Sequence, residues 1–394
     1  MTKWLLRFSL QLILMTKYNL SLLLVLAFLS CNSEKKSDDI GAKNFTFSYE
    51  LDTVHIDSKG TLFFLNNGLM GSNLSPDSKK LFTFNRPNSR LDIIDLEKLE
   101  FYDSLPLEKE GPNGIGQMGI GTINVTDAGD YFFSVYREIK EFDPAGNLKR
   151  TIEWTTDEEI LSQLEHGVLE FYNDKISPEG STYYGIYTAM NIPEKPQQDG
   201  LAIMDINTKK LKMVDLPSLK KASEFRILLQ QTGGTAISAD QANLIVNGSK
   251  ILITNSATNS ISVYDVELDS LKEYAYETEL LPAEKPGNYP RQVGNMEEFN
   301  AAMKEKTKEP MYGKLHFDKK TGYYYRVSFL KKLKPDNKTE WIPVLTIFDT
   351  DLNLIHEETG NFGISFIRNG NFYRFINIDD EMAFEVLTPK YDYE

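Results

Sequence analysis

The chain has 394 residues, of which 41% are hydrophobic and 12% are aromatic, enough to bury a large core. Its formal net charge of -14 argues against a nucleic-acid partner, because phosphate-backbone contacts need clustered Lys and Arg. Its single cysteine excludes an intramolecular disulfide.

An apolar stretch followed by a cysteine lies near the N-terminus. Lys17 precedes the apolar residues 20–29, and the small Ser30 stands directly before Cys31. This order of charged, apolar and small residues is typical of a secretory signal. An uncleaved membrane helix is the alternative, because the apolar region is long enough to span a bilayer.

Residues 28–31, with the sequence Phe-Leu-Ser-Cys, resemble the lipobox of bacterial lipoproteins. That resemblance implies cleavage before Cys31 and lipidation of its thiol. We therefore predict a signal peptide over residues 1–30. Met15 begins a second Met-Thr-Lys sequence and is the expected start of translation, because that start leaves a signal of ordinary length.

Residues 31–44 are predicted to form a lipidated flexible tether. The stretch 32–39 is polar and charged and contains no apolar residue, so it has nothing to bury in a core. Its acidic cluster resembles the surface-export signal of Bacteroidetes lipoproteins. We expect an outer membrane lipoprotein that contacts the membrane through its lipid and faces either the periplasm or the cell surface.

The rest of the chain repeats one pattern, in which an apolar run leads to an aspartate, a polar turn and a second strand. The clearest copy covers residues 344–355, and related copies cover residues 91–99, 139–148, 201–211 and 261–271, with a weaker one at 383–386. Asp can accept a bond from its own backbone two residues on, so each copy predicts a hairpin. A Gly, Asn or Asp turn with a further apolar strand precedes each hairpin. Repeated four-stranded units of this kind predict a β-propeller.

The number of blades and their closure follow from the two ends of the folded part. Residues 45–51 alternate between apolar and polar, whereas the last unit reaches Glu394 without a recognisable fourth strand. We expect the N-terminal strand to complete the last blade and so remove an exposed edge. The prediction is an all-β, six-bladed β-propeller over residues 45–394, or seven blades if residues 57–64 begin a degenerate one.

Two short helices are expected to interrupt the propeller. Residues 156–159 form a capping box before the apolar run 160–164, and residues 295–299 open a second helix. Residues 110–148 resemble an NHL repeat in their Gly-Pro opening, Asp-Gly turn and Phe-Asp-x-x-Gly hairpin. Together with the lipobox and the tether, the chain resembles the six-bladed propeller lipoproteins of Bacteroidetes, which implies architecture and location but no activity.

The sequence offers no metal, cofactor or nucleophile motif. The histidines are widely scattered, at His55, His166, His316 and His356. No His-Glu-x-x-His, paired cysteines or Gly-x-Ser-x-Gly elbow occurs. We therefore predict no metal and no cofactor, and we assign no catalytic residue.

A Tyr-Arg pair recurs in three of the predicted blades. The pairs are Tyr136-Arg137, Tyr325-Arg326 and Tyr373-Arg374. Equivalent positions approach one another around a propeller channel, so Arg326 and Arg374 are candidates to converge on an anionic group, with the tyrosines stacking on it. The alternative, which the acidic composition favours, is that each arginine pairs with an acidic neighbour between blades.

These observations favour a non-enzymatic binding module for a protein, peptide or glycan, because loops on a rigid ring often carry binding residues and no catalytic motif is present. A propeller hydrolase or lyase acting on an extracytoplasmic substrate is the alternative. Such enzymes often spread their site over several blades, so a sequence motif need not reveal it. A small-molecule sensor or structural spacer is a third interpretation.

Overall fold

The computed structural model describes residues 45–116, 119–135, 137–164, 169–189, 199–231, 234–238, 240–333 and 339–393. The predicted signal peptide, Cys31 and the predicted tether lie outside these ranges, as do Tyr136 and His166. Residues Phe45–Asp392 belong to one compact unit.

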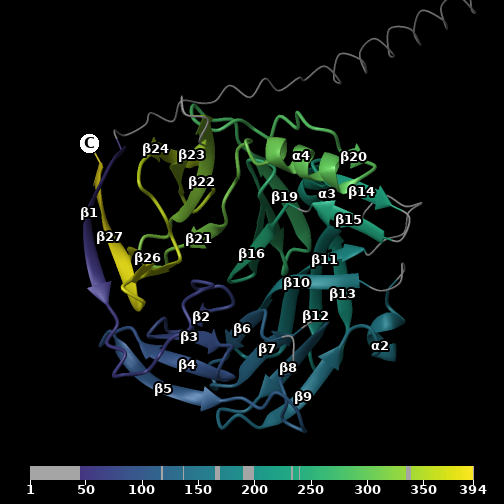
Figure 1. Ribbon diagram of the computed structural model, residues 1–394, viewed down its shortest axis with the longest axis vertical. Coiled ribbons are helices and arrows are strands. Elements are labelled where there is room, and N and C mark those ends of the chain that lie inside the picture. Colours follow the sequence, from purple (N-terminus) through teal and green to yellow (C-terminus); the bar gives the residue numbers. More distant parts are fainter. Residues whose placement is uncertain are drawn as a thin grey trace, which may run out of the picture. The chain divides into compact units, whose positions relative to one another are not determined.

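Within the described residues, the strands form seven sheets, and six of these have four strands each (Figure 1). Sheet 1 contains β2 (Asn73–Leu74), β3 (Lys80–Asn85), β4 (Arg90–Asp95) and β5 (Glu100–Pro106). Sheet 2 contains β6 (Thr122–Val125), β7 (Tyr131–Val135), β8 (Glu138–Phe142) and β9 (Leu148–Glu153). Sheet 3 contains β10 (Leu169–Ile176), β11 (Thr182–Ala189), β12 (Asp199–Asp205) and β13 (Leu211–Asp215).

The second half of the chain continues in the same way. Sheet 4 contains β16 (Ala242–Asn247), β17 (Lys250–Asn255), β18 (Ser260–Asp265) and β19 (Ser270–Ala275). Sheet 5 contains β21 (Leu315–Phe317), β22 (Tyr324–Leu333), β23 (Thr339–Phe348) and β24 (Leu354–Thr359). Sheet 6 contains β25 (Phe366–Arg368), β26 (Asn371–Ile378), β27 (Glu381–Tyr393) and β1 (Phe45–His55). Within these six sheets, strands that are consecutive in the sequence pair antiparallel.

The aspartates of the repeated pattern close the turns that the sequence predicts. In five copies the carboxylate accepts bonds of 2.7 to 3.2 Å from backbone N–H groups two and three or four residues on. The residues are Asp95, Asp143, Asp205, Asp265 and Asp349. Each turn joins the third and fourth strands of its sheet, which confirms the hairpin prediction at all five positions. The weaker copy at 383–386 was wrongly predicted to form a hairpin, because it has Glu385 in place of the aspartate and lies within the strand β27.

Buried apolar side chains form one cluster between each pair of consecutive sheets. Clusters join sheet 1 to sheet 2, sheet 2 to sheet 3, and so on to sheet 6. A further cluster packs Leu81 and Ile94 of sheet 1 against Phe366 and Phe384 of sheet 6. Such clusters are the main source of stability, since each buried large side chain contributes about 1.5–3 kcal/mol.

The first strand of the described chain lies beside the last. β1 is hydrogen-bonded to β27, and Figure 1 shows the purple strand next to the yellow one. Phe47 on β1 is buried in the cluster between sheets 5 and 6. Residues 57–64 form no sheet of their own in the described chain, where Asp57 makes only an isolated bridge to Glu100.

Three short helices lie between the strands of the described chain. α2 (Glu158–Leu161) and α4 (Met296–Lys306) confirm the two predicted helices. The cap of α2 is Asp157, which accepts bonds from the backbone of Glu159 and Ile160, whereas the sequence indicated Thr156. Asp competes better here because its ionised carboxylate favours the positive end of a helix.

The third helix belongs to an insertion that the sequence did not reveal. α3 (Pro217–Ser223) leads into β14 (Ile227–Gln231) and β15 (Gly234–Ser238), and β20 (Gln292–Val293) pairs parallel with β14. We call β14, β15 and β20 the inserted sheet. Its apolar residues pack with α4 in a cluster of their own, so the insertion is a small packed unit beside sheets 3 and 4.

Candidate functional site

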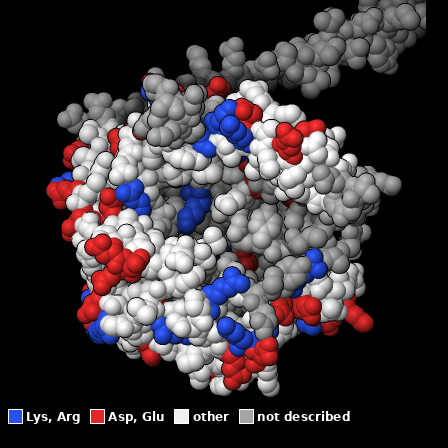
Figure 2. Space-filling model, viewed as in Figure 1, with Lys and Arg blue, Asp and Glu red and all other residues white. Residues whose placement is uncertain are grey.

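The first strands of the six sheets contact one another in chain order. β2 contacts β6, β6 contacts β10, β10 contacts β16, β16 contacts β21, and β21 contacts β25. Side chains on these strands therefore come from distant parts of the sequence and share one neighbourhood. Figure 2 shows Lys and Arg side chains in the hollow at the middle of one face.

Two lysines and a histidine on these strands form a cluster, which we call the cationic site. Lys175 lies on β10, Lys314 directly precedes β21, and His316 lies on β21. The surrounding protein lowers the pKa of Lys175, and the negative charge of Asp174 opposes this shift. The surrounding protein also lowers the pKa of Lys314, and the positive charge of Lys175 lowers it further. Burial, with a smaller effect of Lys314, holds the pKa of His316 well below its ordinary value.

The lysines of the cationic site lack a matching acid. Lys314 Nζ donates to the carbonyl of Ser365 at 3.3 Å. In the part of the chain that the structure describes, no carboxylate forms an ion pair with Lys175 or Lys314. An excess of positive charge beside these strands attracts an anion, and the attraction is stronger wherever the local dielectric is low.

Local structure explains how β10 presents Lys175. The adjacent Asp174 is buried and accepts hydrogen bonds from Thr122 and Ser134 of sheet 2, at 2.6 and 2.5 Å. Successive side chains on a strand point to opposite sides. A bulge between Tyr172 and Lys175 adjusts the register there. Asp174 therefore fixes β10 against sheet 2 and turns Lys175 away from that interface.

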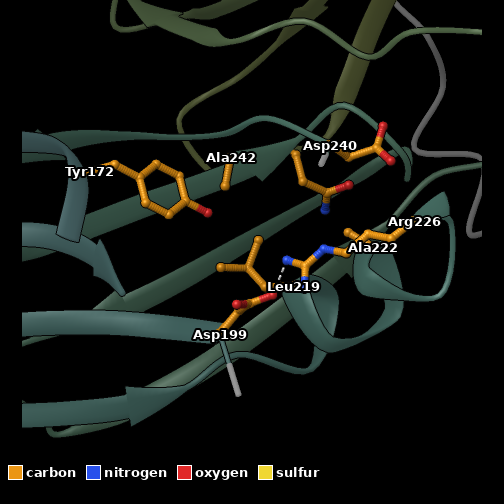
Figure 3. A pocket seen from close by; sticks show the side chains of 8 residues that line it. Tyr172, Asp199, Leu219, Ala222, Arg226, Asp240 and Ala242 are labelled. Atoms are coloured by element: carbon orange, nitrogen blue, oxygen red, sulfur yellow. Dashed lines mark hydrogen bonds and ion pairs between the residues drawn. The ribbon is translucent and has the colours of Figure 1, made fainter. Parts of the chain in front are cut away.

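A second polar region is a small pocket between sheets 3 and 4 and the insertion (Figure 3). Its lining residues are Tyr172, Asp199, Leu219, Ala222, Arg226, Asp240, Ala242 and Asn255. Arg226 donates to Asp199 at 2.5 Å, while Asp199 Oδ1 and Arg226 Nη1 have no partner among the described residues. Figure 3 shows Tyr172 and Asp199 pointing into the pocket. The pocket has room for a very small polar group.

Asp240 at the pocket edge anchors the insertion. Its carboxylate accepts bonds from Lys285, from Lys306 at 2.7 Å and from Ser256 at 2.9 Å. Burial alone would raise the pKa of Asp240, but Lys285 and Lys306 outweigh it and hold that pKa below its ordinary value. One carboxylate thus pairs with two ammonium groups from different segments, so the role of Asp240 is to hold those segments together.

The two arginines predicted to converge have separate partners. Arg326 on β22 is fully buried and donates to Asn259 Oδ1, a neutral acceptor. Arg374 on β26 donates to Asn361 Oδ1 at 2.9 Å and forms an ion pair with Glu385. Glu385 is its cross-strand neighbour on β27, so the acidic partner of Arg374 lies within sheet 6 and not between sheets.

The tyrosines next to these arginines lie in the core. Tyr325 is fully buried, and its hydroxyl bonds the hydroxyl of Tyr391 at 2.6 Å. Tyr373 stacks on Phe366 with 4.9 Å between ring centroids. Both rings thus fill the space between sheets, because residues next to each other on a strand face opposite sides.

The third Tyr-Arg pair falls at a turn. Tyr136 lies outside the described residues, and Arg137 stands directly before β8 with a φ of +64°. The carbonyl of Arg137 accepts a bond from the N–H of Trp154 at 3.2 Å. This left-handed backbone places Arg137 in a different environment from Arg326 and Arg374.

The sequence analysis did not identify the lysines of the cationic site. Lys175 and Lys314 occur in no motif, and 138 positions separate them, as their numbers show. The available signal was indirect, because both stand on or next to the first strand of a predicted unit. His316 was expected to be an isolated surface or core histidine, and its depressed pKa agrees with a buried neutral ring.

No group of three or more His, Cys, Asp or Glu in the described residues is placed to hold a metal ion. None of the helices in the described ranges is long and apolar enough to cross a membrane.

The chain is similar to several solved structures. A DUF4221 family member from Bacteroides vulgatus ATCC 8482 is 16% identical, with a TM-score of 0.66 over 90% of this chain and 100% of that one. A Bacteroides fragilis NCTC 9343 protein described as exported is 7% identical, with a TM-score of 0.47 over 87% of this chain and 95% of that one. A luciferin-regenerating enzyme is 10% identical, with a TM-score of 0.44 over 86% and 95%.

The family follows from the sequence profile. No functionally curated protein matches the chain. The profile of a domain of unknown function, DUF4221, matches residues 44–359, which is most of the sequence. The chain therefore belongs to the DUF4221 family.

Proposed function

We propose that this protein is a binding module that recognises an anionic group on a protein, peptide or glycan outside the cytoplasm. The observation that carries the proposal is the placement of Lys175 on β10 and of Lys314 beside β21, because both strands contact β16 and no carboxylate among the described residues forms an ion pair with either lysine. Like charges enclosed by protein repel each other and disfavour the charged forms. A carboxylate, sulfate or phosphate of a ligand would relieve that repulsion and gain charge-assisted hydrogen bonds.

The architecture suits such a role. We infer that the six four-stranded sheets are the blades of an NHL-like six-bladed propeller, closed by β1, with the inserted sheet outside the series. The clusters between consecutive sheets, including the one between sheets 6 and 1, support this arrangement. The contacts among first strands support a central position for Lys175 and Lys314. Binding sites of propellers commonly lie there, because every blade contributes a strand.

The chemistry of the cationic site favours binding over reaction. Lys175 and Lys314 supply point charges with several donors each. His316 is neutral at pH 7, since its pKa lies well below its ordinary value, so it contributes a hydrogen bond and no charge. Together these groups attract and orient an anion. This donor set explains recognition without requiring a bond to break.

The location follows from the N-terminal sequence. We propose that Cys31 is lipidated and that the protein is an outer membrane lipoprotein facing the periplasm or the cell surface. The Phe-Leu-Ser-Cys sequence at residues 28–31 supports this proposal. Labelling cells with an alkyne fatty acid is expected to mark the native chain and not Cys31→Ser. Label on the serine variant would refute lipidation at this residue.

Ligand binding can be tested with the chain lacking residues 1–30 and carrying Cys31→Ser. Poly-glutamate, a sulfated dextran and a polygalacturonate are the anionic probes, and unmodified dextran is the neutral one, with affinities measured by calorimetry. At least one anionic probe should bind, and Lys175→Met with Lys314→Met should weaken it at least about tenfold, because two charge-assisted contacts are lost.

Lys319→Met is the matched control, since Lys319 is an exposed lysine near β21. Its affinity for the same probe should equal that of the parent chain. An equal loss of affinity in the control and in the double variant would show that the change in net charge, and not the cationic site, causes the effect. Binding of the neutral probe alone would refute recognition of an anion.

A further inference from the structure

A layer of polar side chains is buried between sheets 4 and 5. Arg326 on β22 and Thr346 on β23 are cross-strand neighbours, and both are 0% exposed. From sheet 4, Asn259 is also 0% exposed and contacts Arg326. Thr254, 2% exposed, shares a strand face with Leu252, which packs against sheet 5. These four residues, which we call the Arg326 layer, therefore face the same interface.

The Arg326 layer holds more donors than acceptors. Arg326 Nη2 donates to Asn259 Oδ1, which uses the only strong acceptor of the layer. Arg326 Nε and Nη1, Asn259 Nδ2 and both threonine hydroxyls have no hydrogen-bond partner among the described residues. An arginine and an amide nitrogen can only donate. Buried polar groups are almost always satisfied, so this concentration of donors indicates a bound acceptor.

Within the described residues, no acid forms an ion pair with Arg326. The guanidinium lies 5.2 Å from the ring centroid of Phe348 and 6.0 Å from that of Tyr276. Glu357 exerts a weaker attraction, but its oxygens accept from Thr278 Oγ1 at 2.7 Å and from Leu280 N at 2.9 Å. Burial lowers the pKa of Arg326 to about 10, which still leaves it charged at neutral pH. A buried charge without a partner is strongly unfavourable.

We propose that the Arg326 layer binds one small monovalent inorganic anion of the chloride type. One negative charge balances one guanidinium, and a spherical anion accepts bonds from donors that converge from two sheets. All four residues are buried, so the ligand is a small ion and not a polymer, and this site is separate from the cationic site and independent of its ligand. Its role is to stabilise the contact between sheets 4 and 5, because the ion binds only when both are in place.

The first test replaces chloride by bromide in crystals of the chain lacking residues 1–30 and carrying Cys31→Ser. An anomalous peak within hydrogen-bond distance of Arg326 Nε or Nη1 is expected. Density that refines as water there, with no anomalous peak, would overturn the proposal. Bromide scattered over surface lysines only would count as the same negative result.

The second test measures thermal stability. At constant ionic strength set with gluconate, each tenfold rise in chloride above its dissociation constant should raise Tm by about 2 °C. Arg326→Met should abolish this dependence, and Thr346→Val should weaken it while retaining the charge. Arg374→Met is the control, because Arg374 lies on β26, in a different sheet from Arg326, and already pairs with Glu385. A chloride dependence that persists in Thr346→Val and Arg326→Met would refute the site.

Discussion

The Asp240 carboxylate and the Lys306 ammonium form an ion pair of 2.7 Å, and both side chains are almost fully buried. Lys306 is the last residue of α4, and it also donates to the carbonyl of Phe225, which lies between α3 and β14, at 2.8 Å. One ammonium group thus ties two separate parts of the insertion together.

Lys306→Met should destabilise the protein by about 2–4 kcal/mol. Breaking a buried ion pair typically costs about 3–5 kcal/mol, and Asp240 here keeps Lys285 as a second partner. Urea unfolding measures the change. Lys304→Met, an exposed change on the same helix, is the control and should alter stability by less than about 0.5 kcal/mol. Equal effects of the two variants would contradict the buried role of Lys306.

Asp240 should make stability depend on pH in the acid range. Its folded pKa lies below 3.8, because Lys285 and Lys306 outweigh the effect of burial, while Glu309 contributes a negative charge near Lys306. The stabilisation is therefore complete above the unfolded pKa and is lost as pH falls through the folded one. Unfolding free energies between about pH 5 and pH 2 should fall more steeply in the parent chain than in Asp240→Asn. Identical slopes would show that Asp240 does not carry this effect.

Asp199 and Arg226 should behave as a coupled pair. Either Asp199→Asn or Arg226→Met alone should cost about 3 kcal/mol, since each leaves a buried charge without its partner. The double variant should cost less than the sum of the two single ones, by about 1–3 kcal/mol. A double-mutant cycle by urea unfolding gives this coupling energy. Strict additivity would mean that the 2.5 Å contact contributes nothing specific.

Hairpins were predictable because their cause is local. At Asp143 and Asp349, one carboxylate and the next few backbone N–H groups determine the turn, whatever the rest of the chain does. The inserted sheet depends instead on contacts between β14 and β20, which are far apart in sequence. Short strands of this kind leave no clear period, so the sequence analysis predicted no strand there.

The candidate site was less predictable for the same reason. The sequence drew attention to Arg326 and Arg374 through their repeated Tyr-Arg setting, and the structure gives each a different environment. Lys175 and Lys314 come together only because their strands flank β16. No pattern in the local sequence indicates that these two lysines are close in space. Electrostatic effects between them become visible only with coordinates.

His316 offers a direct measure of that proximity. Lys314→Met should raise the pKa of His316, because the positive charge of Lys314 adds to the effect of burial in lowering it. Titration of the His316 ring protons by NMR measures the pKa in both chains. Lys319→Met should leave the His316 titration unchanged. A Lys314→Met titration identical to that of the parent would place the two groups too far apart for a shared ligand.

Phe47 tests the contribution of the first strand. Phe47→Ala should cost about 3 kcal/mol, since the ring is buried in the cluster between sheets 5 and 6. Leu51→Ala on the same strand is the control, because Leu51 is 47% exposed and should matter little. Guanidinium unfolding compares the two. A small loss for Phe47→Ala would mean that β1 is only loosely held.

The pairing of β1 with β27 also has a consequence for biosynthesis. β1 is the earliest strand of the described chain to be synthesised, and its partner is the latest. Nearly the whole polypeptide must therefore be made before sheet 6 can be completed, and such long-range pairing slows folding. Any product that stops before β27 keeps an open strand edge and an unburied Phe47, which are the features that proteases and aggregation act on. Only a full-length polypeptide is therefore expected to fold completely and to escape proteolysis and aggregation.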